Sequence, residues 1–138
     1  MNFEEFRAFA ESKMETDFTS IPIEFENLTE SVALTAAKNA KTPWSRFVIR
    51  DGDGNLITIG SDVRLDRFAG VMIAQVFVIQ GSGTKAARGY ADDISAIWKG
   101  FSGEPCLQFF TPAISVIGET SGWFQININI PFQNDEQT

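Results

Sequence analysis

Apolar residues recur at helical spacing in two segments of the chain, and the first lies near the N-terminus. Its apolar face consists of Phe3, Phe6, Ala10 and Met14. A stripe of this kind is typical of a helix that packs one side against a core. Asn2 is a suitable N-cap, so we expect a helix that runs to about Glu15.

The second helical pattern covers residues 84 to 99. Its stripe consists of Ala87, Tyr90, Ala91, Ile94, Ile97 and Trp98. Such a stripe predicts a helix lying flat on a sheet. Thr84 is a suitable N-cap, and Gly100 is a suitable residue to end the helix.

A long strand is predicted from Arg64 to Ile79. From Val71 onward it is apolar on both faces, with Met72, Val76 and Val78 on one and Ile73, Phe77 and Ile79 on the other. Strands of this composition are buried from both sides. One face would meet the helices, and the other would be covered by a further layer of this chain or by another subunit.

The region before this strand has weaker patterns. Residues 21–25, with Pro22, suit an edge strand, and residues 28–41 read as an irregular surface loop. Residues 44–50 predict a strand, Asp51-Gly52-Asp53-Gly54-Asn55 a turn, and residues 56–60 the return strand of a hairpin.

Two more strands follow the second helix, Cys106 to Ile117 and Trp123 to Phe132, joined by a turn at residues 118–122. In the last strand apolar residues alternate with Gln125, Asn127 and Asn129. That polar row would face solvent or a subunit contact, and residues 133–138 predict a frayed acidic tail. The elements together predict one α+β domain over residues 1–138, a largely antiparallel sheet of four to five strands packed against two helices.

Composition narrows the classes of partner. The 138 residues are 43% hydrophobic, enough for one domain with a proper core. A net charge of −7 and a pI near 4.5 argue against nucleic acid and anionic membranes as partners.

The start of the chain lacks the features of a signal peptide. Cys106 has no second cysteine to pair with, so we expect it to pack as a small hydrophobe in a reducing compartment.

The chain contains no histidine. It therefore lacks the usual general base at neutral pH and the commonest metal ligand, which excludes Ser-His-Asp and Cys-His catalysis. The acidic residues show no spacing that differs from ordinary surface charge. We expect a protein that is not an enzyme, with no catalytic residues, no cofactor and no metal.

Two motifs give alternatives to this expectation. Gly81-x-Gly83-x-x-Ala86, between a strand and a helix, matches a loose dinucleotide fingerprint. The acidic residue required about 20 residues later is missing, and Lys85 is not preceded by the spacing of a phosphate-binding Walker loop. The sequence leaves open a small nucleotide-binding or ligand-binding enzyme centred on residues 81–84, but favours a tight structural turn.

The second motif is a possible calcium loop. Asp51, Asp53 and Asn55 occupy the first, third and fifth positions of an EF-hand loop. Leu56 replaces the required glycine and Asp62 the bidentate glutamate, and the flanking segments are strands. A plain Asp-Gly turn is therefore the expected structure.

Several short motifs in order give the chain a resemblance to a known family. They are Phe25-Glu26-Asn27, Pro43-Trp44-Ser45-Arg46, Gly60-Ser61-Asp62-Val63-Arg64, Val76-Phe77-Val78, Gly81-Ser82-Gly83-Thr84, Ala91-Asp92-Asp93-Ile94 and Gly118 to Phe132 with Gly122-Trp123-Phe124-Gln125. Over nearly its whole length the chain resembles the tail terminator proteins of long-tailed bacteriophages, the family of the phage lambda minor tail protein U. It departs from that pattern at Ile79-Gln80, where a proline often precedes the glycines.

The resemblance implies a structural role. Proteins of this family form a hexameric ring on the end of the completed tail tube, stop its polymerisation and provide the surface that joins the head. The implied partners are further copies of this chain, the tail tube protein and a head completion or connector protein. The implied location is the head-proximal end of the virion tail, after assembly in the cytoplasm of the bacterial host.

A ring uses heterologous contacts, so each subunit needs two different complementary patches. Candidate residues for contacts to the ring or tube are Arg46, Arg50, Arg64 and Arg67, since arginine favours bidentate carboxylate contacts, and the loop around Asp53. The alternative is that these arginines are solvated residues at strand edges. A head-tail connector or tail completion protein of similar size is an alternative within the virion.

Overall fold

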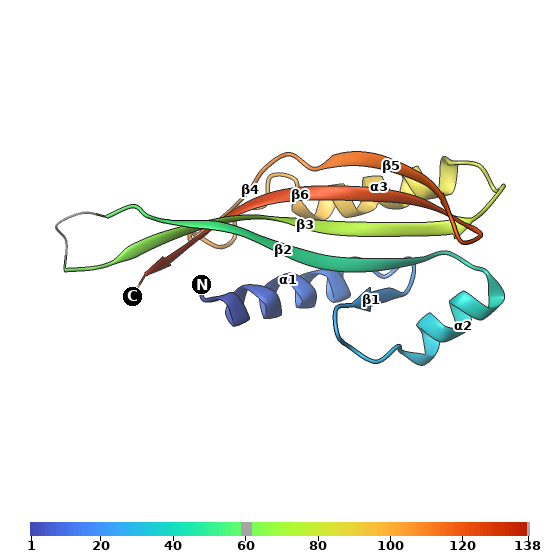
Figure 1. Ribbon diagram of the computed structural model, residues 1–138, viewed down its shortest axis with the longest axis horizontal. Helices are drawn as coiled ribbons and strands as arrows, with labels where there is room; N and C mark the ends of the chain where they lie inside the picture. The colour runs from blue at the N-terminus through green and yellow to red at the C-terminus, as the bar shows by residue number, and fades with distance from the viewer. Residues whose placement is uncertain (59–61, 138) are drawn as a thin grey trace.

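A computed structural model of the protein describes residues 1–58 and 62–137, which form three helices and one six-stranded mixed sheet. The elements are α1 (Phe3–Asp17), β1 (Ile23–Phe25), α2 (Val32–Ala40), β2 (Trp44–Leu56), β3 (Leu65–Ile79), α3 (Lys85–Trp98), β4 (Leu107–Phe109), β5 (Ala113–Thr120) and β6 (Trp123–Gln137). Figure 1 shows their arrangement. The α+β class is confirmed.

The predicted sheet was too simple. Strand order is β1-β2-β3-β6-β4, and β5 pairs with another part of β6. β1 runs parallel to β2, and the other pairs are antiparallel. The sheet is therefore mixed and has six strands, where the sequence predicted four to five largely antiparallel ones.

The helix α1 begins as predicted. The Asn2 side chain accepts a hydrogen bond from the Glu5 backbone N–H at 2.8 Å, and the Glu5 carboxylate accepts one from the Asn2 N–H at 3.0 Å. This reciprocal capping box satisfies two backbone donors that a helix start leaves unpaired. The helix continues two residues beyond the predicted end, to Asp17.

One face of the sheet carries the main core. Alternate residues of β3 and β6 on this face are buried beneath α1 and α3: Met72, Ala74, Val76, Val78, Ile126, Ile128 and Ile130. Trp98, at the end of α3, is fully buried, and its indole N–H points to the Met14 sulfur at 3.3 Å. Both predicted helices thus cover the same face of the sheet.

Among the described residues, α2 covers the opposite face at one end. Leu34 and Ala37 bury their side chains against Trp44 and Phe77, whose rings stack at 4.2 Å. The predicted irregular loop over residues 28–41 is therefore wrong for residues 32–40, which form α2. Ser31 caps α2 through a 3.1 Å bond to the Leu34 N–H, and short helices of this kind are stabilised by packing more than by propensity.

The hairpin turn predicted at Asp51–Asn55 is also wrong. β2 continues through this segment to Leu56, with a bulge between Asp51 and Gly54. A Cβ atom on Gly52 would lie 2.5 Å from the Ala69 carbonyl oxygen. The glycine thus permits close strand approach instead of a turn.

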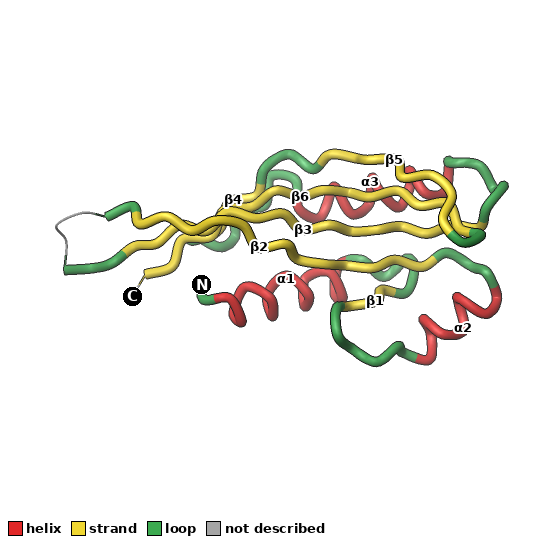
Figure 2. The backbone as a smooth tube through the Cα atoms, viewed as in Figure 1, coloured by secondary structure: helices red, strands yellow, loops and turns green. Residues whose placement is uncertain are grey.

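We call residues 50–58 and 62–70 the arm. Figure 2 shows β2 and β3 running together beyond the rest of the sheet, while β5 and α2 lie toward the other end of the molecule. Along the arm β3 also pairs with the end of β6, from Leu65↔Gln137 to Ala69↔Gln133. Residues 133–137 are therefore strand, and the predicted frayed tail is wrong for them, while Thr138 lies outside the described residues.

The segment predicted as one strand from Cys106 to Ile117 is divided. β4 and β5 are separated by residues 110–112, which include Pro112. Both strands pair with β6, β4 opposite Phe132–Asn134 and β5 opposite Trp123–Asn129. A proline cannot donate to a strand ladder, which explains the break.

Candidate interaction surface

The predicted contact residues lie in two places. Arg46 is on the open face of the sheet body, in register with Gln75 of β3. Arg50, Asp53, Arg64 and Arg67 are all on the arm. The structure therefore places four of the predicted residues along the arm and separates Arg46 from them.

Arg46 is held in a network within its own chain. Its guanidinium donates to Glu24 and to Gln75 Oε1, the latter at 3.4 Å. Glu24 also accepts from Lys38 Nζ at 3.1 Å. Partial burial acts to raise the pKa of Glu24, but the hydrogen bonds from Arg46 and Lys38 outweigh burial and hold the pKa below its usual value. This network ties β1, α2 and β2 together.

Two of the arm arginines also have partners in the chain. Arg67 makes a bidentate pair with Asp135 of β6, with Nε–Oδ1 and Nη2–Oδ2 distances of 2.8 and 3.0 Å. Arg64 Nε donates to Asp66 at 2.8 Å. We predicted that an arginine would bind a carboxylate of a neighbouring subunit in a bidentate pair. Arg67 instead makes such a pair within the chain, between β3 and β6.

Arg50 and Asp53 differ from these residues. Both side chains are exposed, and neither forms an ion pair with any residue that the structure describes. They lie on β2 at the start of the arm and at its bulge. Of the predicted contact residues, these two have charges that remain available to a partner.

The residues of the possible calcium loop do not have the geometry of an EF-hand. Asp51, Asp53 and Asn55 lie along an extended strand, whereas an EF-hand loop wraps its ligands around the ion. Among residues 1–58 and 62–137 no group of three His, Cys, Asp or Glu side chains is placed to hold a metal ion.

The glycine loop before α3 has the backbone of a tight turn. Gly81 and Gly83 have φ angles of 86° and 82°, values that glycine adopts easily. Both neighbours of β3 run antiparallel to it, whereas a dinucleotide fingerprint belongs to a parallel β-α-β unit. Thr84 occupies the N-cap position, but its side chain makes no capping hydrogen bond.

The amide row of β6 is partly satisfied within the chain. Gln125 donates to Asn127 at 2.8 Å, and Asn129 donates to Ser115 of β5 at 3.0 Å. Gln125 is buried, and the other amides are half-buried. The amide side chains on this face of β6 are thus partly hydrogen-bonded within the chain.

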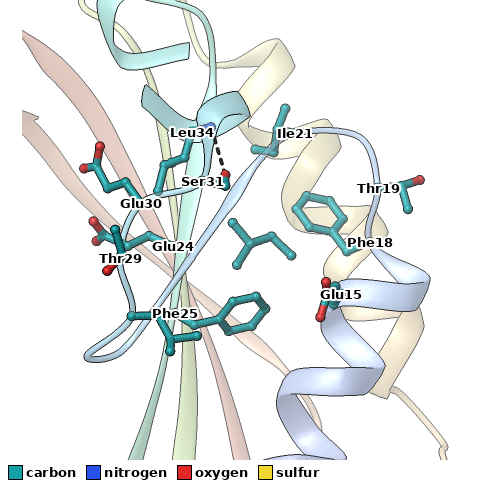
Figure 3. A pocket seen from close by; sticks show the side chains of 12 residues that line it. Glu15, Phe18, Thr19, Ile21, Glu24, Phe25, Thr29, Glu30, Ser31 and Leu34 are labelled. Carbon is teal, nitrogen blue, oxygen red and sulfur yellow. Dashed lines mark hydrogen bonds between the residues drawn. The ribbon is translucent and has the colours of Figure 1, made fainter. Parts of the chain in front are cut away.

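A hollow between the C-terminal end of α1 and the start of α2 is shown in Figure 3. It measures about 450 Å³ and has an apolar floor that includes Phe18, Ile21 and Phe25. Glu24 and Glu30 lie on its rim, where both already pair with Lys38. The hollow thus combines an apolar floor with two acids that are paired within the chain and a third, Glu15, that forms no ion pair with the described residues.

The edge strand β5 carries a feature that the sequence analysis missed. Three of its large apolar side chains are open to solvent: Ile114 is 43% exposed, and Val116 and Ile117 are each 50% exposed. Beside it, a groove of about 330 Å³ separates β5 from α3 and is lined by Ile114 and by Arg88 and Asp92 of the helix. The apolar run was visible in the sequence, but it was interpreted as part of a longer strand.

Long, apolar edge strands are uncommon on the surfaces of monomeric proteins. An unpaired edge presents free backbone donors and acceptors to other chains, so proteins usually shorten it or place charges along it. Over its first six residues, Ala113 to Gly118, β5 carries no charge at all. Contiguous exposed apolar side chains mark interaction sites, and we take β5 as the candidate interaction surface.

Comparisons with known proteins add a fold but no functional name. No protein-family model and no curated protein matches the chain. Among solved structures 11 chains match. One of these carries a serial identifier as its description, and it aligns over 97% of this chain and 96% of its own, with a TM-score of 0.67 and 14% identity. An identity this low shows a shared fold alone.

None of the helices in the described part of the chain is long and apolar enough to cross a membrane.

Proposed function

We propose that this protein is a structural assembly protein that forms a ring, a hexamer as in the family that it resembles, on the end of a phage tail tube. In that role it ends tube polymerisation and offers the surface to which the head is joined. Its partners are its own copies, the tube protein and a head completion or connector protein. It acts at the head-proximal end of the virion tail and is assembled in the bacterial cytoplasm.

The exposed apolar edge at β5 is the observation that carries the proposal. Side chains such as Val116, half exposed on a sheet edge, gain free energy when another surface covers them, at about 25 cal/mol per Å² of apolar area buried. An assembling subunit supplies that surface. The order of the motifs along the chain selects the tail terminator among assembly proteins, and the alternative of a head-tail connector or completion protein shares the same need for a subunit contact.

The experiment combines solution mass with tube capping. Light scattering across a concentration series, and electron microscopy of the protein mixed with growing tail tubes, test whether the chain assembles and whether tube growth stops. We expect Val116→Asp to abolish capping, because a charge on β5 cannot be covered by an apolar partner.

The matched control is Val32→Asp on α2, where the side chain is already 88% exposed. Both variants are expected to keep the circular dichroism of the wild type. A wild-type chain that remains a monomer at every concentration and never decorates a tube end would contradict the proposal. If capping is lost equally in both variants, β5 is not the surface responsible.

A further inference from the structure

Besides β5, the described surface has a second apolar cluster, on the arm. Leu56 is 51% exposed, and Ile57 is 38% exposed. Figure 1 shows the arm extending away from the body, whereas β5 and α3, whose residues line the groove, lie on the body itself. An arm that extends in this direction cannot fold back onto its own groove, so any groove that receives it belongs to another molecule.

The charges along the arm and the groove are complementary. Arg88 and Asp92 lie one helical turn apart on α3 and line the groove. On the arm, Arg50 and Asp53 are three residues apart on β2. No ion pair within the described residues engages any of these four side chains.

The spacings are also compatible. Four helical residues span about 6 Å, and three strand residues span about 10 Å, a length that the bulge after Asp51 reduces. The two long arginine side chains cover the remaining difference. In one alignment Asp53 meets Arg88 while Arg50 meets Asp92, and both pairs are then attractive.

We infer that the arm of one copy docks in the groove between α3 and β5 of the next copy. Asp53 of the arm pairs with Arg88 of the neighbouring groove, and Arg50 pairs with Asp92. Leu56 and Ile57 cover the exposed apolar side chains of β5. This inference rests on the proposed function, and it identifies the two different patches that a head-to-tail ring requires of every subunit.

Disulfide trapping tests the pairing directly. In a Cys106→Ser background, Asp53→Cys and Arg88→Cys are placed in separate chains, mixed at high concentration and oxidised mildly with oxidised glutathione. The expected result is a dimer linked between positions 53 and 88, identified by peptide mass spectrometry. This dimer should form several-fold more than the dimer between Asp53→Cys and the control Lys99→Cys. Lys99 is exposed at the C-terminal end of α3 and lies outside the groove.

A charge exchange provides the second measurement. Asp53→Arg alone and Arg88→Asp alone should each reduce the assembled mass seen by light scattering, because each places like charges together. The double variant carries the reversed pair at every contact and should restore that mass, a coupling that two independent effects do not produce.

The outcomes separate the two proposals. A protein that caps tubes but shows no preference for the 53–88 link keeps the proposed function and refutes the docking of arm in groove. A protein that forms this link, and recovers mass in the double variant, but never stops tube growth keeps the docking and refutes the tail terminator. Absence of both the preferred link and the recovery overturns the docking, whatever the wild-type mass.

Discussion

The sheet body and the arm use the same strands but are stabilised differently. In the body, β3 presents Met72, Ala74 and Val76 to two helices, and all three are fully or almost fully buried. In the arm, β3 residues 65–70 are half-buried or exposed. There the strands are joined by the Arg67–Asp135 pair and by glycines that let the backbones approach.

This difference shows why the two regions suit different roles. The body draws its stability from apolar burial, which is strong and, unlike an ion pair, is not screened by salt. The arm has few buried apolar contacts, and such regions open locally at lower free energy than the core. A region of this kind can adapt to a partner while the body stays folded.

The largest expected effect concerns the core of the body. Replacing Trp98, which has no exposed surface and contacts Phe109 at 4.9 Å between ring centroids, with alanine should lower the free energy of unfolding by about 3–5 kcal/mol. Urea unfolding followed by circular dichroism measures the loss. Phe110→Ala, at a side chain that is 43% exposed, is the control and should cost far less. Equal losses in the two variants would contradict the assignment of the core.

A smaller effect is expected where the body meets the arm. A Cβ atom at Gly70 would lie 2.6 Å from the Arg50 carbonyl oxygen and 2.6 Å from the Phe132 ring. Gly70→Ala should therefore destabilise the protein by about 1–3 kcal/mol through overpacking.

Gly89 is the matched control, because a Cβ atom there meets nothing within 4 Å and the residue lies inside α3. Gly89→Ala should stabilise the protein by about 0.5–1 kcal/mol, since alanine favours a helix over glycine. Thermal unfolding of both variants measures the contrast. A Gly70→Ala protein as stable as the wild type would show that the strands have room to separate.

The smallest expected effect lies in the arm itself. Asp135→Asn removes one half of the pair with Arg67, whose side chain is 41% exposed. Hydrogen exchange of residues 65–69 should become faster, while exchange in Met72 to Val78 stays unchanged. The effect should shrink at high salt, because salt screens exposed pairs. Faster exchange in both regions alike would show that arm and body unfold as one unit.

Much of the body could be predicted from sequence. The apolar stripes of α1 and α3 have the spacing of a helix, and the long apolar run of β3 is typical of a buried strand. All three elements were predicted correctly. The errors occurred in segments whose residue pattern is compatible with two different local structures. Asp51-Gly52 is typical of a turn, yet here Gly52 lies against the Ala69 carbonyl within a strand.

The candidate site was predicted only in part. Arg50 and Asp53 carry available charges, but Arg46 and Arg67 are engaged within the chain by Glu24 and Asp135, which are 22 and 68 residues away in sequence. Partners so distant in sequence are found only when the strands are in register. The edge at β5 was missed for the same reason, because an apolar strand reads the same whether it is central or at an edge.

By itself the sequence determined the fold class, the two helices over the main core and the lack of histidine chemistry, because periodicity and composition act locally along the chain. Only the tertiary structure decided which strands are at the edges, which charges are already paired and which faces remain open. These properties depend on strand order and register, and a pattern of residues does not specify either until the sheet is assembled.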